Sequence, residues 1–245
     1  MNEAMQSAGL RLRSLGLSSR LPDLVISDGA LESLKWLALV AMTCDHFNHI
    51  LFKLQLPVIS EFGRIAMPLF GLVLAYNLAR PYTLQKGIHM RAMARMAFFG
   101  LIATPFYCIA FEKPSWFLLN ILFTLMLATG IIYLIEKGGF YCELLAIALF
   151  ILGGIFVDYI WFGLGYCLAG WYYCKKPCVW RLLLWIGSIT GLYFANDNLW
   201  ALVALPVIFM ATKVDYKMPR LRLAFYIYYP LHLAVLLAIK KWVMV

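Results

Sequence analysis

Five polar side chains interrupt an apolar stretch near the start of the sequence, LKWLALVAMTCDHFNHI, which runs from Leu34 to Ile50. They are Lys35, Asp45, His46, Asn48 and His49. Ionisable groups at the depth of a membrane cost free energy unless they have partners or a function. Histidine is the side chain best suited to move protons near neutral pH, and lysine binds phosphate as a point charge. The stretch could therefore bind an anion at one end and transfer a proton further along.

Helical geometry predicts that four of these side chains share one face. At about 100° and about 1.5 Å per residue, His46 returns to within about 20° of Lys35 and lies about 16 Å along the axis. Asp45 and His49 complete a face about 100° wide, and Asn48 lies beside Asp45. A coenzyme A thioester, which is anionic at one end and reactive at the other, matches this arrangement. The alternative is that Asp45 and His46 only join helices by hydrogen bonds.

A second apolar stretch, FGRIAMPLFGLVLAYNLARP, carries further candidates at both ends. Arg64 lies near its beginning, and Asn77 and Arg80 lie near its end. A cation just inside a membrane needs an anionic partner, so Arg64 is expected either near the acceptor or in a structural ion pair. Asn120, in LLNILFTL, is a lesser candidate of the same kind.

The last apolar stretch, FYIYYPLHLAVLLAI, contains a third histidine. Tyr228 and Tyr229 precede His232 by four and three residues, so their side chains can meet it on one helix face. The stretch is therefore expected to support proton transfer. The alternative is an interior histidine with interfacial tyrosines.

The composition predicts an all-α protein, a polytopic transmembrane helical bundle. The chain has 245 residues, of which 64% are hydrophobic and 13% charged, and its mean hydropathy is +0.82. Soluble domains are nearer half apolar and a quarter charged. The apolar runs are long and do not alternate, which excludes the pattern of a membrane β-barrel. About nine spans (eight to ten) are expected, near residues 31–52, 62–79, 95–111, 117–135, 142–157, 159–174, 181–195, 199–212 and 223–239.

The distribution of basic residues predicts a cytoplasmic N-terminus. With nine spans, sixteen Lys and Arg residues fall on that side and four on the other, and Arg64 lies within the second span. Residues 1–30 are then a basic cytoplasmic tail, and 31–245 form a single transmembrane domain. This topology explains the net charge of +9 without nucleic-acid binding. The six cysteines lack the paired spacing of a metal site, so no metal is expected.

The four quoted stretches, in this order, resemble the TraX family between about residues 31 and 239. Members of this family are membrane proteins of conjugative plasmids associated with N-terminal acetylation of pilin subunits. A wider similarity, to the membrane-bound acyltransferase-3 superfamily, rests on the spacing of Lys35 and His46 and on the YYPLH segment that ends at His232. The paired-arginine motif of that superfamily has only a loose counterpart here, in Arg91 and Arg95.

The resemblance implies an acetyltransferase of the bacterial inner membrane that uses acetyl-coenzyme A and acts on the N-terminal amine of a pilin. The expected catalytic residues are His46, Asp45 and His232, and the expected coenzyme A ligands are Lys35 and Arg80. The remaining candidates would support the substrates: Arg64, His49, Asn48, Asn77, Asn120, Tyr228 and Tyr229. The expected partners are pilin and membrane lipids.

Three alternative functions fit the same sequence. The protein could be a non-catalytic assembly factor or chaperone for pilin, or an enzyme that acetylates a glycan hydroxyl. Intramembrane Asp and His side chains also occur in proton-coupled transporters, but such proteins usually contain inverted repeats or broken paired helices, which this sequence lacks.

Overall fold

The computed structural model describes residues 24–112, 119–221 and 223–243, and all the regular secondary structure in this part of the chain is helical. The only β-type pairing among these residues is an isolated parallel bridge between Leu119 and Val157. The longer helices are α2 (Asp28–Phe52), α4 (Ala66–Ala79), α5 (Ile88–Ala110), α6 (Ile121–Lys137), α8 (Ile160–Lys175), α9 (Val179–Gly191) and α12 (Ala224–Val243). The shorter elements are α3 (Pro57–Gly63), α7 (Phe140–Ala148), the π-helix η1 (Leu149–Gly153), α10 (Tyr193–Asn196), the 3-10 helix η2 (Trp200–Val203) and α11 (Ala204–Ala211).

Every predicted span corresponds to a helix or to consecutive helices, which confirms the all-α class. The segment predicted at 62–79 is divided: α3 begins with Pro57 in its first turn, and α4 follows after Arg64 and Ile65. The span predicted at 95–111 corresponds to α5, which begins earlier, at Ile88. Among the described residues, Pro57–Ala79 and Ile88–Ala110 are long and apolar enough to cross a bilayer. The number of about nine spans stays a prediction.

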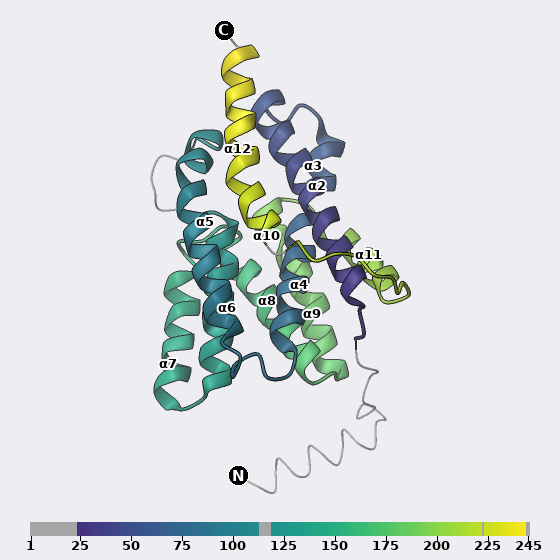
Figure 1. The fold of residues 1–245 in the computed structure, drawn as a ribbon, viewed down its shortest axis with the longest axis vertical. Helices are drawn as coiled ribbons and strands as arrows, with labels where there is room; N and C mark the ends of the chain where they lie inside the picture. The colour runs from purple at the N-terminus through teal and green to yellow at the C-terminus, as the bar shows by residue number, and fades with distance from the viewer. Residues whose placement is uncertain (1–23, 113–118, 222, 244–245) are drawn as a thin grey trace, which may run out of the picture.

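The helices form a bundle around α4 (Figure 1). Helix α4 packs against α2 and α8, α6 packs against α5, α7 and α8, and α12 packs against both α2 and α5. In Figure 1, α2, α5 and α12 reach the end of the molecule where the C-terminus lies. The arrangement brings the first and last predicted spans side by side, although almost the whole chain separates them.

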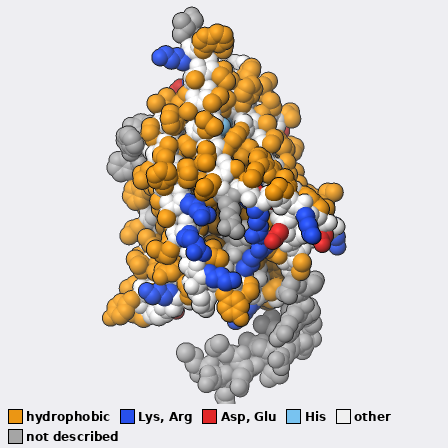
Figure 2. All heavy atoms as spheres, viewed as in Figure 1, with side chains coloured by type: hydrophobic (Ala, Val, Ile, Leu, Met, Phe, Trp, Pro, Cys, Tyr) orange, Lys and Arg blue, Asp and Glu red, His pale blue; other side chains and the backbone are white. Residues whose placement is uncertain are grey.

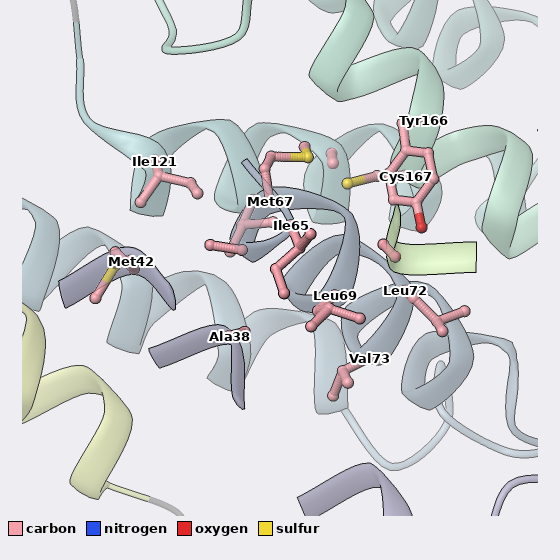
Figure 3. Packing of buried hydrophobic residues seen from close by; sticks show 14 of the residues in the cluster. Ala38, Met42, Ile65, Met67, Leu69, Leu72, Val73, Ile121, Tyr166 and Cys167 are labelled. Carbon is pink, nitrogen blue, oxygen red and sulfur yellow. The ribbon is translucent and has the colours of Figure 1, made fainter. Parts of the chain in front are cut away.

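Helices α4 and α8 meet in the interior, where Figure 3 shows Leu72, Tyr166 and Cys167 in the buried cluster, and their contact depends on Gly71. A Cβ added at Gly71 would lie 2.9 Å from the Tyr166 ring, so a larger residue would push the two helices apart. The Tyr166 hydroxyl, which is fully buried, donates a hydrogen bond of 2.9 Å to the carbonyl oxygen of Pro68. Met67 and Leu69 of α4 are also fully buried in this core.

Large apolar side chains cover much of the exterior (Figure 2). On α5 and α7 they include Phe98, Leu101, Ile109, Tyr141 and Leu145, all of which are at least half exposed. Soluble monomers rarely expose contiguous apolar patches larger than a few hundred Å². The exterior therefore agrees with the membrane location expected from the composition.

A second close approach joins α2 to α3. Asn48 donates hydrogen bonds to the Leu56 carbonyl oxygen (2.8 Å) and to the Ser60 hydroxyl (2.9 Å), and accepts one from the Leu56 amide (3.2 Å). A Cβ added at Gly63 would lie only 2.3 Å from the Asp45 Cβ. The position of α3 therefore depends on the absence of a side chain at residue 63.

Gly63→Ala is expected to destabilise the protein by about 1–3 kcal/mol, because the added methyl group overlaps Asp45 and overpacking costs free energy of this order. The measurement is the apparent melting temperature of the detergent-solubilised protein, followed by circular dichroism. Gly165→Ala in α8 is the control, since nothing lies within 4 Å of a Cβ there and alanine favours the helix. Equal melting temperatures for Gly63→Ala and the unaltered protein would contradict the proposed contact.

Candidate functional site

Two histidines from opposite ends of the sequence meet in the interior, between α2 and α12. His46 Nδ1 lies 2.7 Å from His232 Nε2, and the two rings stack with centroids 5.0 Å apart. Both residues are buried, with 9% and 5% of their surface exposed. The face of α2 that carries His46 therefore points into the bundle.

The backbone determines the tautomers of this histidine pair. His232 Nδ1 lies 3.0 Å from the carbonyl oxygen of Tyr228, which can only accept, so His232 donates from Nδ1. Its Nε2 then has a lone pair and accepts a hydrogen bond from His46 Nδ1–H. In this neutral pair the lone pair of His46 is on Nε2, which makes no hydrogen bond with any residue that the structure describes. His46 Nε2 can therefore accept a proton.

Two tyrosines hold the His232 ring in place. The Tyr228 ring stacks on it with a centroid distance of 5.1 Å, and the Tyr229 ring lies 5.5 Å away. Thr43 donates to the Leu39 carbonyl oxygen (2.7 Å), so the Tyr228 hydroxyl donates to Thr43 Oγ1 at 2.9 Å. Tyr228 and Tyr229 thus both contact His232, as their spacing indicates, and the role of the three residues in a site stays a prediction.

A cavity of about 850 Å³ lies next to the histidine pair, between α2, α4, α5, α6 and α12. Its inner wall is mainly apolar and includes Leu39, Met42, Ile121 and Tyr229. Tyr229 also contacts the histidine pair, because its ring centroid lies 6.4 Å from that of His46. Tyr229 thus contacts both the cavity and the two histidines.

Basic side chains surround the outer part of this cavity, and Figure 2 shows Lys and Arg side chains gathered on this face of the molecule. The cations that line it are Lys35, Arg80, Lys86, Arg91, Arg95 and Arg220, and the acids are Asp28 and Glu32. Six cations against two acids leave an excess of four positive charges. The cavity therefore combines a cationic mouth with an apolar interior.

Half of these cations already have a carboxylate partner. Lys35 Nζ lies 2.5 Å from Glu32, and Arg80 lies 2.5 Å from Asp28, which also pairs with Arg220. The other three cations, Lys86, Arg91 and Arg95, pair with no acid among the described residues. An anionic ligand would meet these three without having to break an ion pair.

The sequence-based site thus overlaps the cavity only in part. Lys35, Arg80 and Asn77 line it as expected, and Asn77 also donates to the Val73 carbonyl oxygen at 2.8 Å. Four further cations of this cavity were not predicted as site residues from the sequence: Lys86, Arg91, Arg95 and Arg220. The spacing of four residues between Arg91 and Arg95, which puts both on one face of α5, was the available signal.

Asp45 and Arg64 lie outside the lining of the cavity. Asp45 is on the side of α2 that faces α3, and Arg64 directly follows α3. Asp45 faces α3, where Gly63 and Ser60 adjoin it, and its charge acts on Arg64 and His49. Asp45 Oδ1 and Arg64 Nε are buried and have no hydrogen-bond partner within the described ranges. His49 packs against the ring of Phe111 at 4.6 Å. These side chains form a polar group beside the histidine pair but outside the lining of the cavity.

Two of the residues predicted to support the substrates, Asn48 and Asn120, hold neighbouring helices together. Asn48 fastens α3 to α2, as described above. Asn120 caps α6 by accepting from the Leu122 amide (3.1 Å), and it donates to the carbonyl oxygen of Gly100 (3.0 Å) and to Thr104 Oγ1 (3.2 Å). Both residues are fully buried and hold helices together.

Comparison of the sequence with known proteins shows the family of this chain. Residues 30–240 match the family described as TraX protein. The chain belongs to the TraX family. One relative, Protein TraX of Escherichia coli, is 34% identical over 131 residues. This match covers 54% of the chain studied here and 50% of the relative, so the chain spans about half the length of the TraX protein it matches. No solved structure matches the chain significantly.

At the mouth of the TraX cavity, the carboxylate of Asp28 is expected to make stability depend on pH. Asp28 lies just before the predicted first span, and its hydrogen bond with Arg80 lowers its pKa below the ordinary value. A carboxyl group with a lowered pKa in the folded state stabilises the protein above its unfolded pKa, about 3.9. That stability is lost as the pH falls through the folded pKa.

Asp28→Asn should therefore melt at a lower temperature than the unaltered protein at pH 5 to 7, and the difference should shrink below about pH 4. The measurement is thermal unfolding in detergent as a function of pH. Asp215→Asn, an exposed change outside this cavity that removes the same negative charge, controls for the effect of net charge. A difference that grows on acidification would show that Asp28 is not stabilised as an anion.

Proposed function

We propose that this TraX-family protein is an integral inner-membrane acetyltransferase that transfers an acetyl group from acetyl-coenzyme A to the N-terminal amine of a pilin subunit. The observation that supports this function is the cavity, whose cationic mouth leads through an apolar interior to the Tyr229 ring in front of the histidine pair. A coenzyme A thioester has the same order of chemical groups: phosphates, a neutral arm, then the reactive carbonyl.

The membrane placement proposed is a bundle of about nine spans with the N-terminus in the cytoplasm. Two helices with the length and hydropathy of a span and the apolar exterior support it. The excess of Lys and Arg on one side then puts the cavity mouth at the cytoplasmic surface. Acetyl-coenzyme A would enter from the cytosol.

The coenzyme A phosphates are expected to bind Lys86, Arg91 and Arg95. These cations have no carboxylate partner in the part of the chain that the structure describes, and the arginine fork suits phosphate oxygens. Lys35 and Arg80 are close enough to contribute, but each would have to leave its carboxylate first. The thioester then reaches the inner end of the cavity beside Tyr229, and the acetyl group meets the histidine pair when that ring moves aside.

The proposed reaction uses His46 Nε2 as the general base. The amine nitrogen attacks the thioester carbonyl carbon, a C–N bond forms, and His46 Nε2 takes the proton of the amine. The C–S bond then breaks, and the leaving thiolate accepts a proton from His46, which gives the acetylated amine and free coenzyme A. His232 stabilises the transient charge on His46 through the Nδ1–Nε2 hydrogen bond and is held by the Tyr228 carbonyl oxygen.

His46→Asn and His46→Gln are expected to lower the rate of pilin acetylation by about 10²–10⁴-fold. The asparagine amide can keep a donor near the Nδ1 position, and neither substitution supplies a base at Nε2. The measurement is the intact mass of pilin over time in membrane vesicles supplied with acetyl-coenzyme A. His89→Asn, a buried histidine of α5 outside the proposed site, is the matched control and should acetylate at the normal rate.

Normal acetylation by both His46 variants would end the assignment of the base. If pilin keeps its unmodified mass with the unaltered protein while pilus number depends on that protein, the function is that of an assembly factor. If the acetyl group is found on a glycan rather than on pilin, the reaction class holds and the acceptor changes.

Arg91→Gln with Arg95→Gln is expected to raise the KM for acetyl-coenzyme A about tenfold or more with little change in kcat, because two charged contacts to phosphate are lost and each charge-assisted contact is worth more than 1 kcal/mol. Initial rates at varied acetyl-coenzyme A concentration give the two constants. Lys137→Gln, an exposed change at the end of α6, is the control. A loss confined to kcat would contradict a role in binding the donor.

A further inference from the structure

A second, smaller cavity of about 450 Å³ lies beside the first and has no role in the proposed reaction. It is enclosed by the C-terminal ends of α6 and α8, the first turn of α9 and the loop that contains residues 82–85. Thr83 lines both cavities, so the smaller one lies at the same end of the molecule as the cationic mouth.

The smaller cavity has an unbalanced positive charge. Its cations are Lys175, Lys176 and Arg181, and its one acid is Glu136. Glu136 is already neutralised: its side chain is 8% exposed, Lys175 Nζ lies 2.5 Å from one oxygen, and His89 Nε2 lies 3.4 Å from the other. Lys176 and Arg181 are left without a carboxylate partner among the residues that the structure describes.

The guanidinium group of Arg181 is held in a defined position. It lies over the Tyr172 ring, 3.7 Å from the centroid, and donates to the Lys176 carbonyl oxygen at 2.6 Å. Arginine has five N–H donors, so most of them stay available after this contact. A positioned guanidinium loses little further freedom when it binds an oxyanion.

The wall of the smaller cavity contains a further unused donor. Trp171 is 6% exposed, and its indole N–H has no acceptor within the described part of the chain. A buried donor without a partner costs free energy. Together with Lys176 and Arg181, this donor suits a ligand rich in oxygen atoms and negatively charged.

The surroundings favour a ligand that also carries apolar chains. Tyr172 and Trp180 are 45% and 57% exposed, and the outward side of α9 continues with exposed Leu183 and Leu184. Exposed Tyr and Trp side chains are typical of the level of lipid headgroups. Basic pockets at the cytoplasmic ends of transmembrane helices bind anionic lipid headgroups.

We propose that the smaller cavity binds the phosphate of an anionic phospholipid headgroup, with Arg181 and Lys176 as its ligands and the acyl chains along the exposed side of α9. The proposal rests on the membrane placement proposed above and not on acetyl transfer. The same phosphate chemistry is present in the nucleotide part of coenzyme A, which is the competing source of the ligand.

The test uses the full chain purified in detergent and titrated with phosphatidylglycerol or phosphatidylcholine, with bound lipid counted by native mass spectrometry. The unaltered protein should bind one phosphatidylglycerol in clear preference to phosphatidylcholine. Lys176→Gln with Arg181→Gln should weaken this binding about 30-fold, since each basic residue contributes about fivefold near an anionic lipid. Lys213→Gln with Lys217→Gln removes the same charge from exposed positions outside both cavities and should bind like the unaltered protein.

Equal binding by the Lys176/Arg181 double variant and the unaltered protein would overturn the proposal. Displacement of phosphatidylglycerol by free coenzyme A would also overturn it and assign the cavity to the nucleotide. Circular dichroism confirms that the variants fold. Pilin acetylation is measured separately, so a missing lipid site and a missing acetyltransferase activity are distinguishable outcomes.

Discussion

The hydrogen bond between His46 and His232 is the interaction on which the rest of the site depends. It joins the first and last long helices of the described chain, and it can form only if α2 and α12 keep their register along one another. Because the Tyr228 carbonyl oxygen accepts from His232, the direction of both hydrogen bonds is determined by the backbone. The reactive lone pair on His46 Nε2 is thus a consequence of helix packing and of the limited chemistry of a carbonyl group.

Ion pairing divides the basic residues of the large cavity into two groups: those that have a carboxylate partner and those that have none among the described residues. Asp28 and Glu32 neutralise Arg80, Arg220 and Lys35, and these pairs hold α2, α4 and the segment before α12 together at the mouth. Lys86, Arg91 and Arg95 have no such partner within the described ranges and give the cavity its excess of positive charge. The smaller cavity shows the same division. Lys175 neutralises Glu136, whereas Arg181 has no carboxylate partner among the described residues. In both places carboxylates, of which the side chains of Glu32 and Glu136 are buried, neutralise part of the positive charge, and the remaining cations have no carboxylate partner among the described residues.

Much of this arrangement was predictable from sequence because it follows from helix periodicity. The spacing of Lys35 and His46 puts both on the inward side of α2, and the spacing of Tyr228, Tyr229 and His232 brings the tyrosines to the histidine ring. The pairing of particular charges was less predictable. Asp45 precedes His46 in the sequence, yet it faces Arg64, because a step of one residue turns a side chain by about 100° and Gly63 lets α3 approach there.

The sequence by itself determined the helical class, the approximate position of each helix and the residues able to do acid–base chemistry, since hydropathy and a 3.6-residue period are local properties of a chain. Only the tertiary structure decided that His46 and His232 form a hydrogen-bonded pair, that Tyr229 contacts both this pair and the cavity, and that Arg91 and Arg95 line the same space as Lys35. These relations join residues that lie far apart in the sequence. They depend on which helices pack together and at what rotation, and that choice is made by glycine contacts, buried hydrogen bonds and side-chain volume acting together.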